Sequence, residues 1–257
     1  MTAHDLPNAQ EAHYEAIHDA YEAHYYDQSS MAYRHRFIYR PLFAGLKLDG
    51  ASVADLACGS GHNSLALRHY FPSVRTTGYD ISESACRDYR LRTGSVAHQI
   101  DLTREVEPAE IHDAALIIGG LHHCVADLDT TLKNVARMLR PGGRFLMMEP
   151  SEDFFLSAVR RIWYKKDRWF EAETEAALVH DELSRQAAPY FVPERVLHVG
   201  GPAFYLILNS LVTRVPLKLK PRIAPPLFAA ESLYNKLPGR APFAVFLAEW
   251  RRTETPT

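Results

Sequence analysis

One apolar run that ends in a small-residue turn constrains this chain more than any other stretch. Residues 52–57 are mostly apolar, Cys58-Gly59-Ser60-Gly61 follows, and residues 63–70 have the spacing of a helix. Glycines let the backbone turn sharply and approach a ligand closely. The stretch therefore predicts a strand, a loop and a helix whose free N–H groups point toward whatever the loop holds. A loop of this kind also occurs where a strand and a helix simply pack tightly.

A second acidic residue strengthens the functional interpretation. Asp80 follows the strand-like residues 74–79, which places it at the carboxyl tip of a second strand. That position is where a carboxylate receives the two hydroxyls of a ribose. Asp55 lies at the end of the first strand, so we expect both acids to face the same crevice.

The pattern of the rest of the chain predicts alternating strands and helices. This alternation is typical of an α/β fold, here a Rossmann-like, mainly parallel seven-stranded sheet with helices on both faces. Ser82 and Asp127 are expected to cap helices, the second of which ends near Arg140, before Pro141-Gly142-Gly143. The predicted strands are residues 52–57, 74–79, 95–100, 114–118 and 144–149, then 195–199 or its continuation through 203–207, and 243–250.

The ordered motifs from about residue 52 to residue 150 resemble the core of a class I S-adenosylmethionine-dependent methyltransferase. The acid followed by alternating small residues matches the family's first motif, with Ala57 where glycine is usual. Residues 119–123, Gly-Gly-Leu-His-His, resemble the motif after strand four. Residues 139–150 resemble the turn and fifth strand of relatives of the quinone-biosynthesis methyltransferases.

The resemblance implies a cofactor, S-adenosylmethionine (SAM), with S-adenosylhomocysteine (SAH) as its product. Asp80 would bind the ribose hydroxyls, Ile81 would pack on adenine, and Asp101-Leu102 would hold the adenine amino group and ring edge. Gly119 would meet the methionine end. The cofactor-binding residues implied are Asp55, Ala57, Gly59, Gly61, Asn63, Asp80, Ile81, Asp101, Leu102 and Gly119.

Two adjacent histidines are the candidates for catalysis. Methyl transfer is a direct displacement, so the protein mainly aligns the reactants. A phenol or alcohol acceptor gains from a base, and histidine is suited to this near neutral pH. His123, with His122, follows strand four on the expected acceptor side, and we expect His123 to act as base or to position the acceptor. Alternatively, His123 bonds to the backbone and only shapes the site.

Residues 1–48 are expected to form an N-terminal helical lid. Tyr14, His18, Tyr21 and Tyr25 fall on one helical face, residues 27–30 interrupt it, and residues 31–44 suggest a second helix broken near Pro41. The aromatic face could instead pack on the domain. The candidate lid or substrate contacts are Tyr21, Tyr25, Tyr26 and Arg36.

Residues 49–257 are expected to form the methyltransferase domain. Within it, residues 151–192 would be a substrate-recognition insertion, with Trp163 and Trp169 among basic residues, or a solvated helix. Residues 193–257 would supply the closing strands and a proline-rich apolar excursion. Its segment 211–228 carries several cations and could contact a membrane surface or a lipid, but a strand hairpin with a proline-rich excursion or a homodimer contact is the favoured interpretation.

Composition limits the remaining options. With 29 basic and 31 acidic side chains the formal charge is −2, so we expect no nucleic-acid partner. The three cysteines form no Cys-x-x-Cys pair and the thirteen histidines form no ligand pattern, so neither a disulfide framework nor a metal site is predicted. The first residues lack the pattern of a signal peptide, which favours a cytoplasmic protein.

Together these observations predict a SAM-dependent methyltransferase acting on a small-molecule acceptor. O-methylation is favoured, N- or C-methylation stays open, and specialised metabolite, quinone or lipid biosynthesis is the expected setting. One alternative is an NAD(P)-dependent oxidoreductase, for which Gly59-x-Gly61 and Asp80 are partly suitable. The other is a non-catalytic SAM-binding partner subunit.

Overall fold

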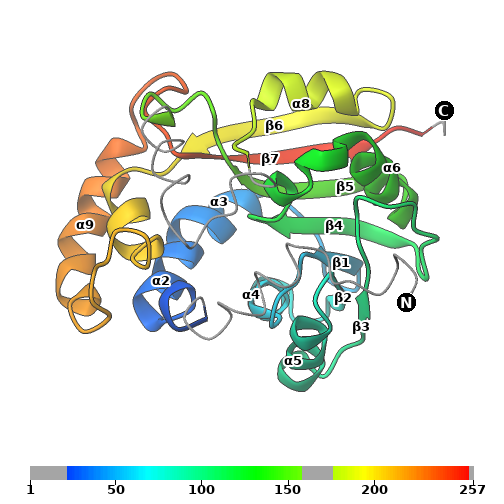
Figure 1. The fold of residues 1–257 in the computed structure, drawn as a ribbon, viewed down its shortest axis with the longest axis horizontal. Helices are drawn as coiled ribbons and strands as arrows, with labels where there is room; N and C mark the ends of the chain where they lie inside the picture. The colour runs from blue at the N-terminus through cyan, green and yellow to red at the C-terminus, as the bar shows by residue number, and fades with distance from the viewer. Residues whose placement is uncertain (1–21, 158–175, 255–257) are drawn as a thin grey trace, which may run out of the picture.

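A seven-stranded sheet forms the centre of the computed structural model, which describes residues 22–157 and 176–254 (Figure 1). The strand order is β3-β2-β1-β4-β5-β7-β6. The strands are β1 Ser52–Leu56, β2 Arg75–Asp80, β3 Ala97–Gln99, β4 His112–Ile118, β5 Leu139–Pro150, β6 Phe191–Val199 and β7 Val245–Arg252. The expected α/β sheet is confirmed.

The direction of the strands brings the carboxyl ends of the first five to one edge. Strands β1 to β5 pair in parallel, and β7 is antiparallel to both β5 and β6. From β1 the sheet grows through β2 and β3 on one side and through β4 and β5 on the other, so β1 and β4 are neighbours at the point where the strand order reverses. Ligands of open parallel sheets bind at such a reversal point, outside the carboxyl ends.

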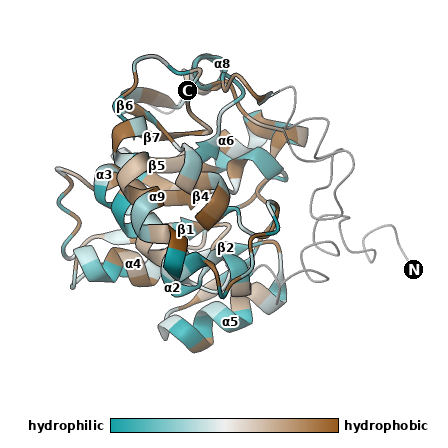
Figure 2. Ribbon diagram, turned by 90° about the vertical axis from the view of Figure 1, so that its left-hand side faces the viewer, coloured by the Kyte–Doolittle hydropathy of each residue, from teal (hydrophilic) through white to brown (hydrophobic). Residues whose placement is uncertain are grey.

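Each face of the sheet has its own hydrophobic core because successive strand residues point in opposite directions. In β1, Val53 belongs to one core and Ala54 to the other. The N-terminal helices and α4 (His62–Tyr70) cover the first face, while α6 (Leu128–Met138) and α8 (His180–Ala187) cover the second (Figure 1). In Figure 2 the central strands β1 and β4 are largely hydrophobic, whereas the outer helix α5 (Glu83–Thr93) is mixed.

Both expected helix caps are present. The Ser82 side chain accepts a hydrogen bond from the Ala85 backbone N–H at the start of α5. The Asp127 carboxylate accepts one from Thr130 at the start of α6. Each bond satisfies a backbone donor that has no partner inside the helix, which stabilises a helix by about 1 kcal/mol.

The N-terminal helices form one continuous run without the break expected near Pro41. The run consists of α2 (Gln28–Arg34), the π-helical turn η1 (His35–Tyr39) and α3 (Arg40–Leu42). The start at Gln28, ahead of the expected residue 31, follows from the Asp27 carboxylate, which accepts from Ser29 and Ser30 N–H groups. The π turn before Pro41 replaces α-helical bonding with a bond from Arg40 to His35, so the proline ends up in the first turn of α3, where it is tolerated.

The C-terminal region differs most from expectation. After Gly200, which has φ +99°, the chain forms the π-helical turn η4 (Phe204–Leu208), so the strand proposed through residues 203–207 is wrong. The expected strand hairpin in 211–228 is also wrong, because α9 covers Lys220–Tyr234. Pro221 sits in its first turn, where no N–H partner is needed. No helix in the described part of the chain is long and apolar enough to cross a membrane.

Candidate active site

The loop after β1 is built from three residues in the left-handed region. Ala57, Gly59 and Gly61 have φ +48°, +49° and +90°. A Cβ at Gly61 would lie 2.5 Å from Thr93 Cγ2, so glycine here lets the loop pack against α5. Alanine at 57 adopts a conformation that costs an L-residue about 1 kcal/mol. The loop is therefore held in a strained, tightly fitted shape at the carboxyl end of β1.

Asp80 ties this loop to the end of β2. Its side chain is 9% exposed, Oδ2 accepts from the Gly59 N–H at 2.9 Å, and Oδ1 accepts from the Ser82 N–H at 3.0 Å. Burial raises the pKa of Asp80, and these backbone hydrogen bonds lower it in part. Each carboxylate oxygen keeps a further lone pair, and an acceptor-only group at this place is suited to a ribose diol. The residues present thus fit a nucleoside cofactor.

Asp55 and Asn63 lie beneath the loop. Asp55 is fully buried, and its Oδ2 accepts from Ser64 Oγ at 2.7 Å. Burial raises its pKa to about 7, while hydrogen bonds from Ser64 and Asn63 oppose the shift. The Asn63 carbonyl oxygen accepts from the Tyr39 hydroxyl at 2.8 Å. The Asp55 bond therefore ties the start of α4 to β1, and the Asn63 bond ties it to η1.

The loop after β4 touches the loop after β1. A Cβ at Gly120 would lie 2.6 Å from Ala57 Cβ, so only glycine permits this approach. Gly119, with φ +70°, is less crowded, since the nearest atom to an added Cβ is His122 Cε1 at 4.0 Å. The two loops therefore meet at the reversal point of the sheet, with room above Gly119.

A buried glutamate, which the sequence reasoning did not single out, organises the loop after β4. Glu149 lies at the end of β5 and is fully buried. Its carboxylate accepts from the backbone N–H groups of Gly120, Leu121 and His122 at 3.1, 2.8 and 3.2 Å. It also bonds the His122 ring through Nδ1 at 2.8 Å. A charged residue within an otherwise apolar strand is the sequence signal that could have identified it.

The two candidate histidines lie together, with ring centroids 4.0 Å apart. Because the carboxylate of Glu149 can only accept, the His122 Nδ1 must carry the proton, which makes Nε2 the basic nitrogen when the ring is neutral. The His122 carbonyl accepts from the Ala176 N–H at 3.3 Å. The chain after residue 175 thus returns to this loop.

The other predicted cofactor residues lie after β2 and β3. The Asp101 carboxylate accepts from the Thr103 N–H at 3.0 Å and pairs with Arg104 at 3.2 Å. Leu102 is buried in the core beneath α6, and the Ile81 carbonyl accepts from Gln99 Nε2. In this structure Asp101 is therefore engaged within its own turn.

Comparison with known proteins identifies the domain. Residues 54–145 match the family model described as "Methyltransferase domain". The matched region is similar to class I S-adenosylmethionine-dependent methyltransferases. The match covers the glycine loop, Asp80 and the loop that carries both histidines, and it favours S-adenosylmethionine over a nicotinamide cofactor.

Relatives and solved structures agree with the methyltransferase family. The chain is 26% identical over 172 residues to the ubiquinone/menaquinone biosynthesis C-methyltransferase UbiE of Geobacter sulfurreducens, which covers 64% of each protein. It is 30% identical to the S-adenosyl-L-methionine-dependent Diels-Alderase iccD of Talaromyces variabilis, over 39% of this chain and 36% of that protein. The chain thus spans less than two thirds of these relatives. A SAM-dependent methyltransferase structure from Thermotoga maritima shares the fold, with TM-score 0.61, 16% identity and coverage of 95% and 99%.

The N-terminal region contacts the glycine loop. The Tyr26 ring stacks on His62, at the start of α4, with centroids 3.8 Å apart. Glu22, another residue not singled out from the sequence, accepts from Ser60 Oγ and pairs with His62 at 3.2 Å and Arg92 at 3.3 Å. Burial raises the pKa of Glu22, but the bonds from His62 and Ser60 outweigh this and lower it to about 2.

The remaining lid candidates are placed elsewhere. The Tyr25 hydroxyl donates to Asn209 at 2.8 Å, and Arg36 donates to Ser232 on α9 at 2.9 Å. Both side chains therefore engage the C-terminal helices. Tyr21, the earlier part of the aromatic face, and the Trp163 and Trp169 region lie outside the described residues.

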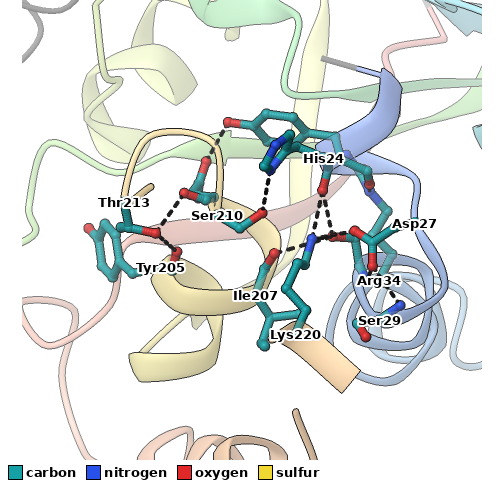
Figure 3. Close-up of polar contacts among 12 residues, drawn as sticks. His24, Asp27, Ser29, Arg34, Tyr205, Ile207, Ser210, Thr213 and Lys220 are labelled. Atoms are coloured by element: carbon teal, nitrogen blue, oxygen red, sulfur yellow. Dashed lines mark hydrogen bonds and ion pairs between the residues drawn. The ribbon is translucent and has the colours of Figure 1, made fainter. Parts of the chain in front are cut away.

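A buried lysine joins the N-terminal helices to α9 (Figure 3). The Lys220 ammonium pairs with the Asp27 carboxylate and donates to Ser30 Oγ at 2.7 Å and to the His24 carbonyl at 2.8 Å. Lys220 is fully buried, so it is unavailable to a membrane surface, contrary to its grouping with the exposed cations of 211–228. Its internal role is to fix α2 against the start of α9.

Proposed function

We propose that this protein transfers a methyl group from SAM to a small-molecule acceptor. The observation that carries the proposal is the carboxylate of Asp80 at the end of β2, bonded to the glycine loop of a methyltransferase domain. Bound SAM would supply an electrophilic methyl group on a sulfonium sulfur. The chain spans only part of its curated relatives, one of which is named a Diels-Alderase.

The proposed cofactor contacts follow the loops in order. Asp80 would accept from the ribose hydroxyls, and Ile81 and Leu102 would lie along the adenine. Asp101 would exchange its Thr103 contact for the adenine amino group. Gly119, where an added Cβ would meet only His122 Cε1, at 4.0 Å, would let the methionine end approach the backbone. Ala57, Gly59 and Gly61 would shape the loop, while Asp55 and Asn63 would support it from below.

The histidine pair supports transfer to oxygen. An imidazole nitrogen would take the proton of an acceptor hydroxyl while the oxygen bonds to the methyl carbon and the carbon–sulfur bond breaks, so that the electron pair stays on sulfur and SAH leaves. The bond from His122 to Glu149 favours a basic Nε2 on His122, and His123 lies against that ring. We therefore propose one of the two as base and the other as the group that positions the acceptor.

The acceptor class is proposed from the site and the relatives. A phenol, a quinol precursor or a lipid-like alcohol would suit a neutral base beside an apolar core, and one relative is named a quinone-biosynthesis C-methyltransferase. N- and C-methylation remain alternatives. The helices at residues 22–42, with Tyr26 over the glycine loop, are proposed as the lid. A homodimer and a cytoplasmic location stay predictions.

Transfer of tritium from methyl-labelled SAM to a panel of phenols, amines, carboxylic acids and prenyl lipids tests the function. We expect at least one hydroxyl acceptor to be labelled, with the rate of His122→Ala or His123→Ala reduced about 100-fold and SAH binding retained. If SAH binds tightly and no acceptor is labelled, the chain is a SAM-binding partner subunit. If both histidine variants keep full activity on a hydroxyl acceptor, the proposed base is wrong.

A further inference from the structure

The outer face of α9 is exposed and almost entirely apolar. The exposed residues recur at helical spacing and thus share one side of the helix. Leu233 in this face is 68% exposed. An outward face of a helix is normally charged or polar. The exposed positions of α9 are Pro221, Arg222, Pro225, Pro226, Ala229, Ala230 and Leu233.

The residues on either side of α9 extend this apolar surface. Leu217 and Leu219, just before the helix, are 39% and 41% exposed, and Leu237, just after it, is 46% exposed. Helix α9 lies on the side of the molecule that faces the viewer in Figure 2. We call residues 214–237 the α9 surface.

The α9 surface is positively charged and has no exposed acid. Between residues 209 and 240 the sole acidic residue is Glu231, which is fully buried and accepts from Tyr33 and from the Gly201 and Ala203 N–H groups. The exposed cations flank both ends of the apolar face and form no ion pair with another described residue. They are Arg214, Lys218, Arg222 and Lys236.

This charge pattern contrasts with the whole chain, whose formal charge is −2. Exposed leucines and prolines between unpaired cations suit the interface of an anionic phospholipid bilayer. There the acyl chains are apolar and the head groups carry negative charge. An acidic protein partner would account for the cations but not for the many exposed apolar side chains between them. A second copy would bring like charges face to face.

We propose that the α9 surface docks on anionic phospholipid membranes. The helix lies along the interface, with Leu217, Leu219 and Leu233 inserted among the lipid head groups and the cations at the phosphates. Docking does not depend on methyl transfer, so it stands apart from the proposed function. The segment 211–228 noted in the sequence contributes only part of this surface, because its Lys220 is buried and Leu233, Lys236 and Leu237 lie beyond it.

Flotation of the full chain with lipid vesicles tests the proposal. We expect binding to vesicles of phosphatidylcholine with about one third phosphatidylglycerol, none to pure phosphatidylcholine, and weakening by added salt. The double variant Lys218→Glu/Arg222→Glu should bind roughly tenfold more weakly or worse. Lys47→Glu/Arg75→Glu, with the same charge change at exposed sites near the amino ends of the strands, should bind like the wild type.

A second pair of variants separates apolar insertion from charge. Leu233→Asp should lose binding, whereas Leu91→Asp, at a 79% exposed site on α5, should not. SAH titration of every variant reports whether the fold is intact. The proposal is overturned if the wild type ignores anionic vesicles or if the α9 variants bind as their controls do. Loss of a dimer in Leu233→Asp, with vesicle binding unchanged, would assign the surface to a second copy instead.

Discussion

At the residue scale, Glu149 is the side chain on which the loop after β4 depends. Its carboxylate gathers three backbone N–H groups and the His122 ring within a fully buried position. A buried charge is tolerated only when it is hydrogen-bonded in this way. The loop geometry and the orientation of His122 therefore have a common support.

Replacement of Glu149 by glutamine should damage both stability and turnover. The glutamine amide has the same shape as the carboxylate. Its NH2 group donates, however, and would face backbone N–H groups of residues 120–122 that also donate. We expect the free energy of unfolding to fall by about 1–3 kcal/mol, measured by urea denaturation. With an acceptor in hand, kcat should fall more than KM changes, and the pH–rate profile should shift. Glu107→Gln, at an exposed site, should change neither quantity. An unchanged pH–rate profile in Glu149→Gln would leave Glu149 a purely structural role.

Sequence reasoning located the residues whose position follows from a strand end. Asp80 and Gly119 lie where the order of strands and loops predicts. Glu149 and Glu22 were not found, because their importance comes from partners 27 to 70 positions away in the sequence. Gly61 was attributed to ligand approach, and the structure adds a packing reason through Thr93. A local sequence pattern does not reveal contacts between residues that are far apart in the chain.

At the element scale, the segment before α2 closes on the glycine loop through Glu22. Its pKa is lowered to about 2 from the ordinary 4.5, so the folded state holds the carboxylate in its charged form. The attachment it provides is complete above pH 4.5 and is lost as the pH falls toward 2. The same loss should follow at neutral pH from removing the charge.

We therefore expect Glu22→Gln to loosen the N-terminal segment. Hydrogen exchange at residues 22–27 should accelerate several-fold, and SAH affinity should fall by a similar factor because Tyr26 is held less firmly over His62. Glu83→Gln, which breaks an exposed pair with Arg90, serves as control. Equal exchange rates in the two variants would show that Glu22 does not hold the segment.

The helix α9 shows why element prediction failed in the C-terminal region. Three prolines within residues 220–234 argue against a helix when considered alone. Here Pro221 occupies the first turn, while Pro225 and Pro226 are exposed and Ala224 and Phe228 are buried in the core. Packing of Ala224 and Phe228 in the core outweighs the backbone hydrogen bonds that Pro225 and Pro226 cannot donate. A local sequence pattern does not show that packing.

Lys220 provides a stability test of the junction between α2 and α9. Lys220→Met removes a buried ammonium and takes one hydrogen-bond donor away from each of Asp27, Ser30 and the His24 carbonyl. We expect the free energy of unfolding to fall by about 2–3 kcal/mol, measured by thermal or urea denaturation. Lys218→Met, two residues earlier and exposed, should have almost no effect. Equal stability of the two variants would contradict the role assigned to Lys220.

At the scale of the whole molecule, the fold was the most predictable feature. Regular alternation of apolar strands and capped helices determines a parallel sheet, and the order of its loops determines which side chains share the carboxyl edge. The two faces then acquire separate cores from alternate strand residues. The acceptor side depends on insertions that vary among proteins of one fold, so the motifs do not specify the substrate.

Calorimetric titration of the purified chain with SAH, and in parallel with NAD and NADP, tests the central claim most directly. We predict saturable SAH binding, no nicotinamide binding, and at least about tenfold weaker SAH binding in Asp80→Asn, because one acceptor oxygen for the ribose hydroxyls becomes a donor. Saturable NAD or NADP binding without SAH binding would contradict the assignment. So would wild-type SAH affinity in Asp80→Asn.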